Sequence, residues 1–226
     1  MNLEGKAPVR IRHSSFQNGF TIIEMLVVII VIFILAALVL AASSYVQDRG
    51  KRARAETEIA AMSAALESYK ADNGIYVRNP TSGGPTDTLD AQTMFDPANA
   101  NTAQYKSASL ILYRALSGDR NLDRSVNATD GNFDIDGSSL ATPLNQAPPT
   151  YFSFKPAMLL PAPPSTATVT AIRDPFGNSY GYSTANQANS SKGFNPTYDL
   201  WSTAAKAPSP TPAPPTKQQD LWIKNW

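Results

Sequence analysis

Residues 19–42 read GFTIIEMLVVIIVIFILAALVLAA, and this stretch decides the fold. From residue 20 onward only Thr21 and Glu24 interrupt the apolar run. As a helix rising about 1.5 Å per residue it is roughly 35 Å long, enough to cross a hydrocarbon core of about 30 Å. A secretory signal has a shorter apolar region of about 7–15 residues, although the small residues 41–43 would suit its cleavage. We therefore expect a transmembrane helix over residues 20–42, with cleavage near residue 43 as the alternative.

Glu24 is an acid near the start of this apolar run. A carboxylate inside a membrane costs about 2.5–3.5 kcal/mol on insertion scales, so it needs a partner. If the bond between Gly19 and Phe20 were cut, the new α-amine of Phe20 would lie one helical turn from the acid. That ammonium, on the same or a neighbouring subunit, could neutralise it. The alternative is that Glu24 lies at the interface and extends to the lipid headgroups.

The helical pattern continues beyond the membrane segment without a proline. Apolar or small residues recur there at alternating spacings of four and three, at Ala55, Ile59, Met62, Leu66 and Tyr69. This spacing predicts one buried face of an amphipathic helix, and Asp72-Asn73-Gly74 supplies residues that end helices. We expect one helix over residues 20–72. The amphipathic continuation of the membrane segment covers residues 43–74, which include the signal that ends the helix.

The remaining residues, 75–226, are expected to form one globular head. Residues 79–150 are polar and irregular apart from a short helix at 107–116, within a variable insertion at 79–173, and residues 204–217 form a proline-rich loop. Three segments cluster β-branched and aromatic residues between turn signals, as antiparallel strands do: 167–172, 178–183 and 197–202. The fold class is therefore α+β, a long N-terminal α-helix packed on a small antiparallel sheet, with the apolar end at 220–226 docked on it.

The composition excludes several classes of function. The formal net charge is +1, so no nucleic acid is expected as a partner, because phosphate binding needs a basic surplus. The chain has no cysteine, and its one histidine, His13, precedes the apolar run. There is no GxxxxGK[ST] motif, so a partner ATPase would have to drive any mechanical work. No paired carboxylates mark an active site, and we do not expect an enzyme.

The segment around Gly19 and Phe20 resembles the class III signal of type IV prepilins: a basic leader ending in Gly, then Phe-Thr-x-x-Glu and an unbroken hydrophobic helix. The resemblance implies that residues 1–19 are a leader, removed by a prepilin peptidase on the cytoplasmic side. It also implies N-methylation of Phe20, and a contact between Glu24 and the Phe20 amine of a neighbouring subunit during assembly. The head would then lie outside the inner membrane.

Four further stretches narrow the resemblance to the major pseudopilins of type II secretion, the general secretion pathway protein G family. They are YKADNGIY at 69–76, DPFGNSYGY at 174–182, YDLWS at 198–202 and the ending DLWIKNW at 220–226. Pro175 and Gly177-Asn178 also suit a tight turn without any reference to the family. No resemblance covers residues 79–173.

The head of that family holds a calcium ion after its Tyr-Asp-Leu-x-Ser strand. Here Asp220 and the Leu200 carbonyl match positions near that site, but too few oxygens remain for the about 6–8 that Ca²⁺ takes, so we expect the calcium site to be incomplete. A second acidic stretch, residues 130–137, begins like a calcium loop, yet its twelfth position falls on Pro143. We expect a solvated polar turn there.

These observations favour a structural subunit of a type IV pilus-like filament, a pseudopilin that helps to drive protein export. It would be a homo-oligomer assembled with an inner-membrane platform, a partner ATPase and minor pseudopilins. It would span the bacterial inner membrane once, with the head in the periplasm and the filament in the periplasm or at the cell surface. The alternatives are a type IV pilin for adhesion, motility or DNA uptake, and a minor binding module at a filament tip.

Overall fold

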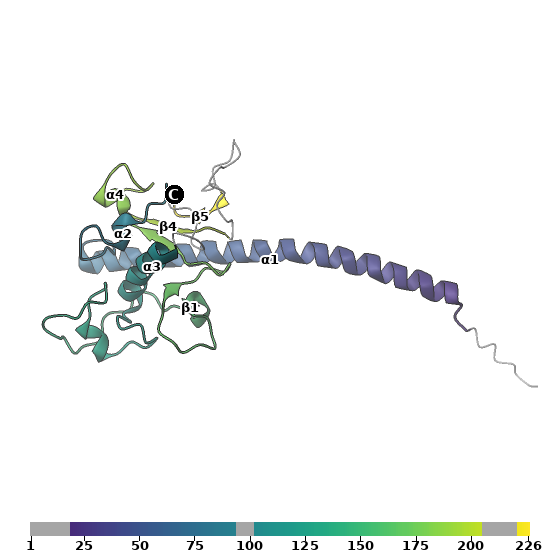
Figure 1. The fold of residues 1–226 in the computed structure, drawn as a ribbon, viewed down its shortest axis with the longest axis horizontal. Helices are drawn as coiled ribbons and strands as arrows, with labels where there is room; N and C mark the ends of the chain where they lie inside the picture. The colour runs from purple at the N-terminus through teal and green to yellow at the C-terminus, as the bar shows by residue number, and fades with distance from the viewer. Residues whose placement is uncertain (1–18, 94–101, 205–220) are drawn as a thin grey trace, which may run out of the picture. The chain divides into compact units, whose positions relative to one another are not determined.

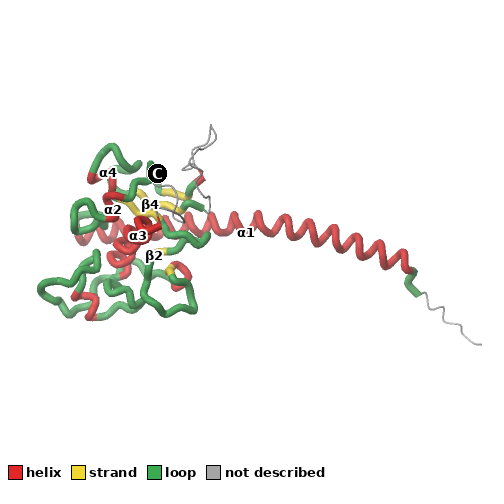
Figure 2. Tube along the Cα trace, in the orientation of Figure 1, coloured by secondary structure: helices red, strands yellow, loops and turns green. Residues whose placement is uncertain are grey.

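The computed structural model describes residues 19–93, 102–204 and 221–226, which belong to two compact units divided between Gln47 and Asp48. Helices, short strands and long loops alternate along the chain (Figures 1 and 2). The elements are α1 (Ile22–Asn73), α2 (Pro85–Thr88), α3 (Thr102–Ser117), η1 (Ala128–Asn132), η2 (Pro156–Met158), β1 (Leu159–Leu160), β2 (Ala171–Ile172), β3 (Gly181–Ser183), α4 (Ala185–Ala188), β4 (Asp199–Ser202) and β5 (Ile223–Lys224).

The first unit contains the apolar part of α1. Within the described residues, Ile22–Leu40 is the one segment long and apolar enough to cross a membrane, by length and composition, and none of it is buried. Its branched and aromatic side chains are exposed along their whole length, as a lipid-facing helix requires. The helix begins at Ile22, two residues later than the sequence predicted.

The second unit begins with the remainder of α1, whose predicted apolar face is buried except at Tyr69, which is half-buried. Ala55, Met62 and Leu66 are fully buried and Ile59 almost so. The helix ends where the Asp-Asn-Gly signal predicted: Asn73 is its last residue, and Gly74 takes φ +77°, a left-handed conformation that favours glycine. This part of α1 is one wall of the core of the head.

Two small antiparallel sheets lie in the head. β3, β4 and β5 form one sheet in that order, with Tyr182 opposite Leu200 and Trp201 opposite Lys224. β1 and β2 form the other sheet. All three strand segments predicted from the sequence contain a strand, but each is shorter than predicted, β1 was not predicted, and the docked C-terminal segment supplies β5.

Most of the described residues in 79–173 lie outside helices and strands, as predicted, but the segment contains more elements than the one short helix and one strand expected there. It contains α2, η1, η2, β1, β2 and α3, and α3 is 16 residues long and packs on both β2 and β3. Ile111, Leu112 and Leu116 of α3 enter the same core cluster as the buried face of α1. A second cluster, centred on Trp201, includes Tyr105 from the unpredicted start of α3.

Candidate assembly site at the start of α1

Thr21 and Glu24 form reciprocal hydrogen bonds across the first turn of α1. The Thr21 hydroxyl oxygen accepts the backbone N–H of Glu24 at 3.3 Å, while Oε2 of Glu24 accepts both the backbone N–H and the hydroxyl of Thr21 at 2.8 Å. This is the reciprocal capping box, which satisfies N–H groups that have no partner within the helix. The acid therefore has a local partner in the uncut chain, and the cap explains why α1 starts at Ile22.

Gly19 and Phe20 lie directly before this turn, in non-helical backbone. Phe20 is 75% exposed, and among the described residues beyond its chain neighbours none lies within 4 Å of the position that a Cβ on Gly19 would take. The structure thus brings Gly19, Phe20 and Glu24 together at one exposed helix start. Their roles in processing and assembly stay predictions.

Sequence reasoning gave Glu24 an amine as its partner and missed Thr21. The local signal was present, because Thr-x-x-Glu before an apolar run is the pattern of a capping box. Among the described residues only Thr21 donates to the Glu24 carboxylate, and all of these bonds go to Oε2. Oε1 is left open to another donor.

Of the two candidate calcium ligands, the described part of the chain includes only Leu200. Asp220 lies outside the described residues, and the Leu200 carbonyl accepts the backbone N–H of Asn225 at 3.2 Å. Within residues 19–93, 102–204 and 221–226, no group of three or more His, Cys, Asp or Glu side chains could hold a metal ion. Calcium binding through Asp220 and the Leu200 carbonyl therefore stays a prediction.

The acidic stretch 130–137 forms a turn, but its first carboxylate is not solvated as expected. Asp130 is fully buried, and Asp134 and Asp136 each accept the N–H of a nearby residue in the turn. The Asp130 side chain accepts three backbone N–H groups, from Arg120 at 2.8 Å, Asn121 at 3.0 Å and Asn127 at 2.8 Å. Its oxygens hold the loop together instead of facing a metal ion.

The motif at 174–178 forms the expected hairpin turn, with Gly177 at φ +102°. The buried Asp174 carboxylate accepts the N–H groups of Phe176 at 3.0 Å and Asn178 at 2.8 Å, and the Ser202 hydroxyl at 2.6 Å. Burial raises the pKa of Asp174 despite these hydrogen bonds. The motif therefore closes the turn and joins it to β4.

The C-terminal motif attaches to the same strand through Asn225. Its side-chain oxygen accepts the N–H of Leu200 at 2.9 Å, and its amide nitrogen donates to the Tyr198 carbonyl at 3.2 Å. The Trp222 ring stacks on Trp201 with 5.8 Å between centroids. These contacts confirm that the end of the chain docks on the head.

A membrane-length helix that opens with a capped Thr-x-x-Glu turn and continues into an α+β head defines the type IV pilin-like class of fold. The family described as the prokaryotic N-terminal methylation motif matches residues 14–40, which include this turn. The predicted fold class is therefore confirmed, and the motif together with the apolar helix indicates that α1 is a membrane anchor.

Within that class the chain is similar to type II secretion system core protein G. The protein of Pseudomonas aeruginosa is 45% identical over 60 residues, 26% of this chain and 42% of that protein. The protein of Vibrio cholerae is 30% identical over 95 residues, 42% of this chain and 60% of that protein. The protein of Klebsiella michiganensis is 40% identical over 60 residues. The chain thus spans about half the length of these relatives, and the resemblance drawn from its motifs is confirmed. No solved structure matches the chain.

Proposed function

We propose that this chain is the structural subunit of a type IV pilus-like filament, a pseudopilin of a type II secretion system that helps to drive protein export. The observation that carries the proposal is the methylation motif placed on a capped Glu24 turn at the start of a membrane-length helix. The similarity to relatives named as core protein G supports secretion over an adhesive or motility pilus. A structural role, rather than an enzymatic one, follows from the same relatives.

Processing would convert the start of α1 into a charged assembly site. A prepilin peptidase cuts between Gly19 and Phe20, and the new Phe20 amine is methylated. Oε2 of Glu24 still accepts the hydrogen bonds from Thr21, and Oε1 can accept one from the Phe20 ammonium of a neighbouring subunit. Because an unpaired charge in an apolar bundle is costly, only the stagger that pairs the two charges is favoured. The pair would fix the register between subunits.

The resemblance to type II secretion pseudopilins supports the other parts of the proposed system. The chain has no P-loop motif, so a partner ATPase and an inner-membrane platform would supply the work of assembly. Copies of the chain would form the body of the filament together with minor pseudopilins. The chain would cross the inner membrane once, with the leader in the cytoplasm and the head in the periplasm.

Two matched variants separate the charge of Glu24 from its role in the cap. Glu24→Gln removes the charge but keeps an oxygen that can accept the Thr21 N–H, since glutamine also serves in capping boxes. Thr21→Val removes the hydroxyl but keeps that N–H and the acid. Each variant would be expressed with the peptidase and assembly components, and filaments would be counted by electron microscopy after processing is checked by mass spectrometry.

The proposal expects both variants to be processed. Glu24→Gln would then form few or no filaments, whereas Thr21→Val would assemble close to the level of the unmodified chain. Filaments of Glu24→Gln in normal number would refute the charge pair. Loss of filaments in Thr21→Val alone would show that Glu24 acts only as a helix cap.

A further inference from the structure

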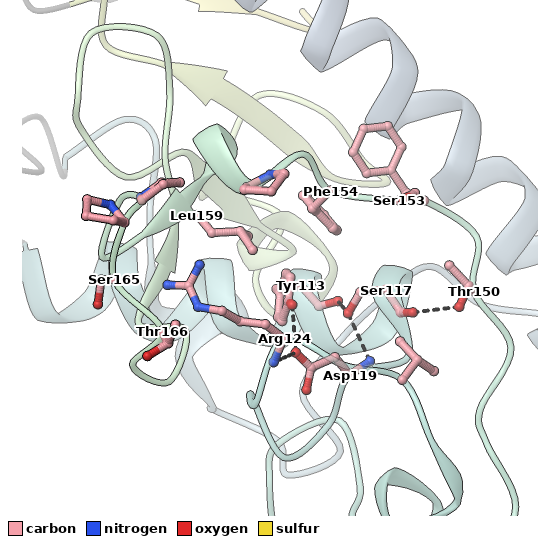
Figure 3. A pocket seen from close by; sticks show the side chains of 15 residues that line it. Tyr113, Ser117, Asp119, Arg124, Thr150, Ser153, Phe154, Leu159, Ser165 and Thr166 are labelled. Atoms are coloured by element: carbon pink, nitrogen blue, oxygen red, sulfur yellow. Dashed lines mark hydrogen bonds between the residues drawn. The ribbon is translucent and has the colours of Figure 1, made fainter.

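A cavity of about 330 Å³ lies in the head, within the part of the chain that the sequence resemblance does not cover. It is open to solvent and is lined by the C-terminal end of α3, the loop that follows α3, and the segments before and after β1 (Figure 3). Its volume is in the range of small-molecule sites. The walls are mainly apolar, and include Tyr113, Val126, Phe152, Phe154, Leu159 and Pro163.

Arg124 places a fixed positive charge in this cavity. Its Nε donates to the Ala167 carbonyl at 2.8 Å and its Nη2 donates to the Pro161 carbonyl at 2.7 Å. The side chain thus reaches from the loop after α3 to the segment beyond β1, as Figure 3 shows. Carbonyls orient the guanidinium but do not neutralise it. Within the described residues the ion pairs are Arg54 with Glu58 and Arg78 with Asp87, so no carboxylate is paired with Arg124.

Asp119 also lines the cavity, but its oxygens are already used. It accepts the Tyr113 hydroxyl at 2.7 Å, the Asp123 N–H at 3.1 Å and the Arg124 N–H at 2.8 Å. This buried carboxylate therefore supports the loop that carries Arg124, at backbone φ +73°, and is not open to a ligand. The polar side chains at the cavity that remain available are a cation and hydroxyl groups such as those of Ser153 and Thr166.

We propose that this cavity binds a small organic carboxylate, with the carboxylate on the guanidinium of Arg124 and an apolar or aromatic body against Phe152 and Phe154. Arginine presents several N–H donors in one plane and binds carboxylates through paired hydrogen bonds. The aromatic and proline walls suit a flat apolar ligand body, and binding would remove the walls and the ligand body from water. The site would serve ligand recognition on the surface of the head and does not depend on the filament proposal.

Binding can be measured on the full chain in lipid nanodiscs by ¹⁹F NMR, with 4-fluorophenylacetate as the probe and 4-fluorophenylacetamide as its neutral match. Empty nanodiscs correct for partition into lipid. We expect the acid to bind with a Kd in the millimolar range or below, and the amide about tenfold more weakly or worse.

Three variants locate the binding. Arg124→Gln should remove the preference for the acid. Since Arg124 also holds two loops, Val126→Trp provides a second variant: Val126 is 40% exposed at the cavity, and a larger ring there should block both probes without breaking a hydrogen bond. Leu144→Trp is the matched control, because Leu144 is exposed and lies outside the lining, and it should bind like the unmodified chain.

The site would be supported if the unmodified chain binds the acid more tightly than the amide, if Arg124→Gln loses this preference, and if Val126→Trp binds neither probe. Equal binding of the acid and the amide would overturn it, and so would unchanged binding by Val126→Trp. Absence of binding by the acid up to about 10 mM would also overturn it.

Discussion

The ion pair between Arg78 and Asp87 should be one of the most sensitive polar contacts in the head. Asp87, in α2, is 3% exposed and accepts Nε of Arg78 at 2.8 Å and Nη2 at 2.9 Å, a two-bond arrangement. The Gly83 N–H and the Thr184 hydroxyl complete its partners at 3.2 and 3.0 Å. The pair thus ties the chain after α1 to α2 and to the end of β3.

Replacing Arg78 should lower the free energy of unfolding more than replacing Asp87. Arg78→Met leaves a buried carboxylate with its two weaker donors, and breaking a buried pair costs about 3–5 kcal/mol, so we expect about 3 kcal/mol at pH 7. Asp87→Asn leaves Arg78, whose side chain is 31% exposed and can be hydrated, so we expect about 1.5 kcal/mol. Lys155→Met is a control, an exposed charge whose loss should change stability by less than about 0.5 kcal/mol.

The pH dependence gives a second check. Burial alone would raise the pKa of Asp87, but the hydrogen bonds from Arg78, Thr184 and Gly83 together hold it below its ordinary value. The contribution of Asp87 is therefore fully present above its unfolded pKa and is lost as pH falls through the folded pKa. In Arg78→Met the acid can be protonated in place, so the difference in stability from the unmodified chain should shrink from pH 7 towards acid.

Urea unfolding of the full chain in detergent micelles measures these differences. The three tryptophans all lie in the head, so their fluorescence reports its unfolding. The reasoning fails if Arg78→Met costs less than about 1 kcal/mol. It also fails if Asp87→Asn costs more than Arg78→Met, or if the difference stays constant on acidification.

The same unfolding assay checks three further expectations. Gly181→Ala should cost about 1–3 kcal/mol by overpacking, because its Cβ would lie 2.2 Å from Cε2 of Trp201; no loss would contradict the close approach. The pKa of buried Asp174 is raised in the folded chain, so the stability that Asp174 contributes is present below its unfolded pKa and is lost as pH rises through its folded pKa. Asp174→Asn should therefore flatten the dependence of the free energy of unfolding on pH between these two pKa values. Asn225→Ala should cost about 1–3 kcal/mol by leaving the Leu200 N–H unpaired, and a neutral result would show that the C-terminal segment is not held there.

The parts of the fold that could be predicted are those encoded by nearby residues. The apolar run and the spacing of Ala55 to Leu66 define α1, and Gly74 ends it. The turn at 174–178 forms because Gly177 can take positive φ and Asp174 can accept N–H groups two and four residues ahead. Such signals need no knowledge of the rest of the chain.

The parts that could not be predicted depend on distant residues. The first turns of α3 are mostly polar, and Tyr105 is buried there by packing against Trp201, 96 residues further along the chain, whose Nε1 donates to the Tyr105 hydroxyl at 3.0 Å. Asp130 looks like a surface acid in the sequence, yet it is fully buried and its carboxylate accepts a backbone N–H from the loop after α3. Thr21 is a different case, because the nearby Thr-x-x-Glu pattern is itself enough to predict its capping role.

The central claim is that the chain is a prepilin-type precursor, and mass spectrometry of its N-terminus tests that claim most directly. The chain would be expressed with and without a prepilin peptidase. We predict that the peptidase produces a mature chain beginning at Phe20 and one methyl group heavier than its sequence. A chain that still begins at Met1, or one cut near Ser43, would contradict the account.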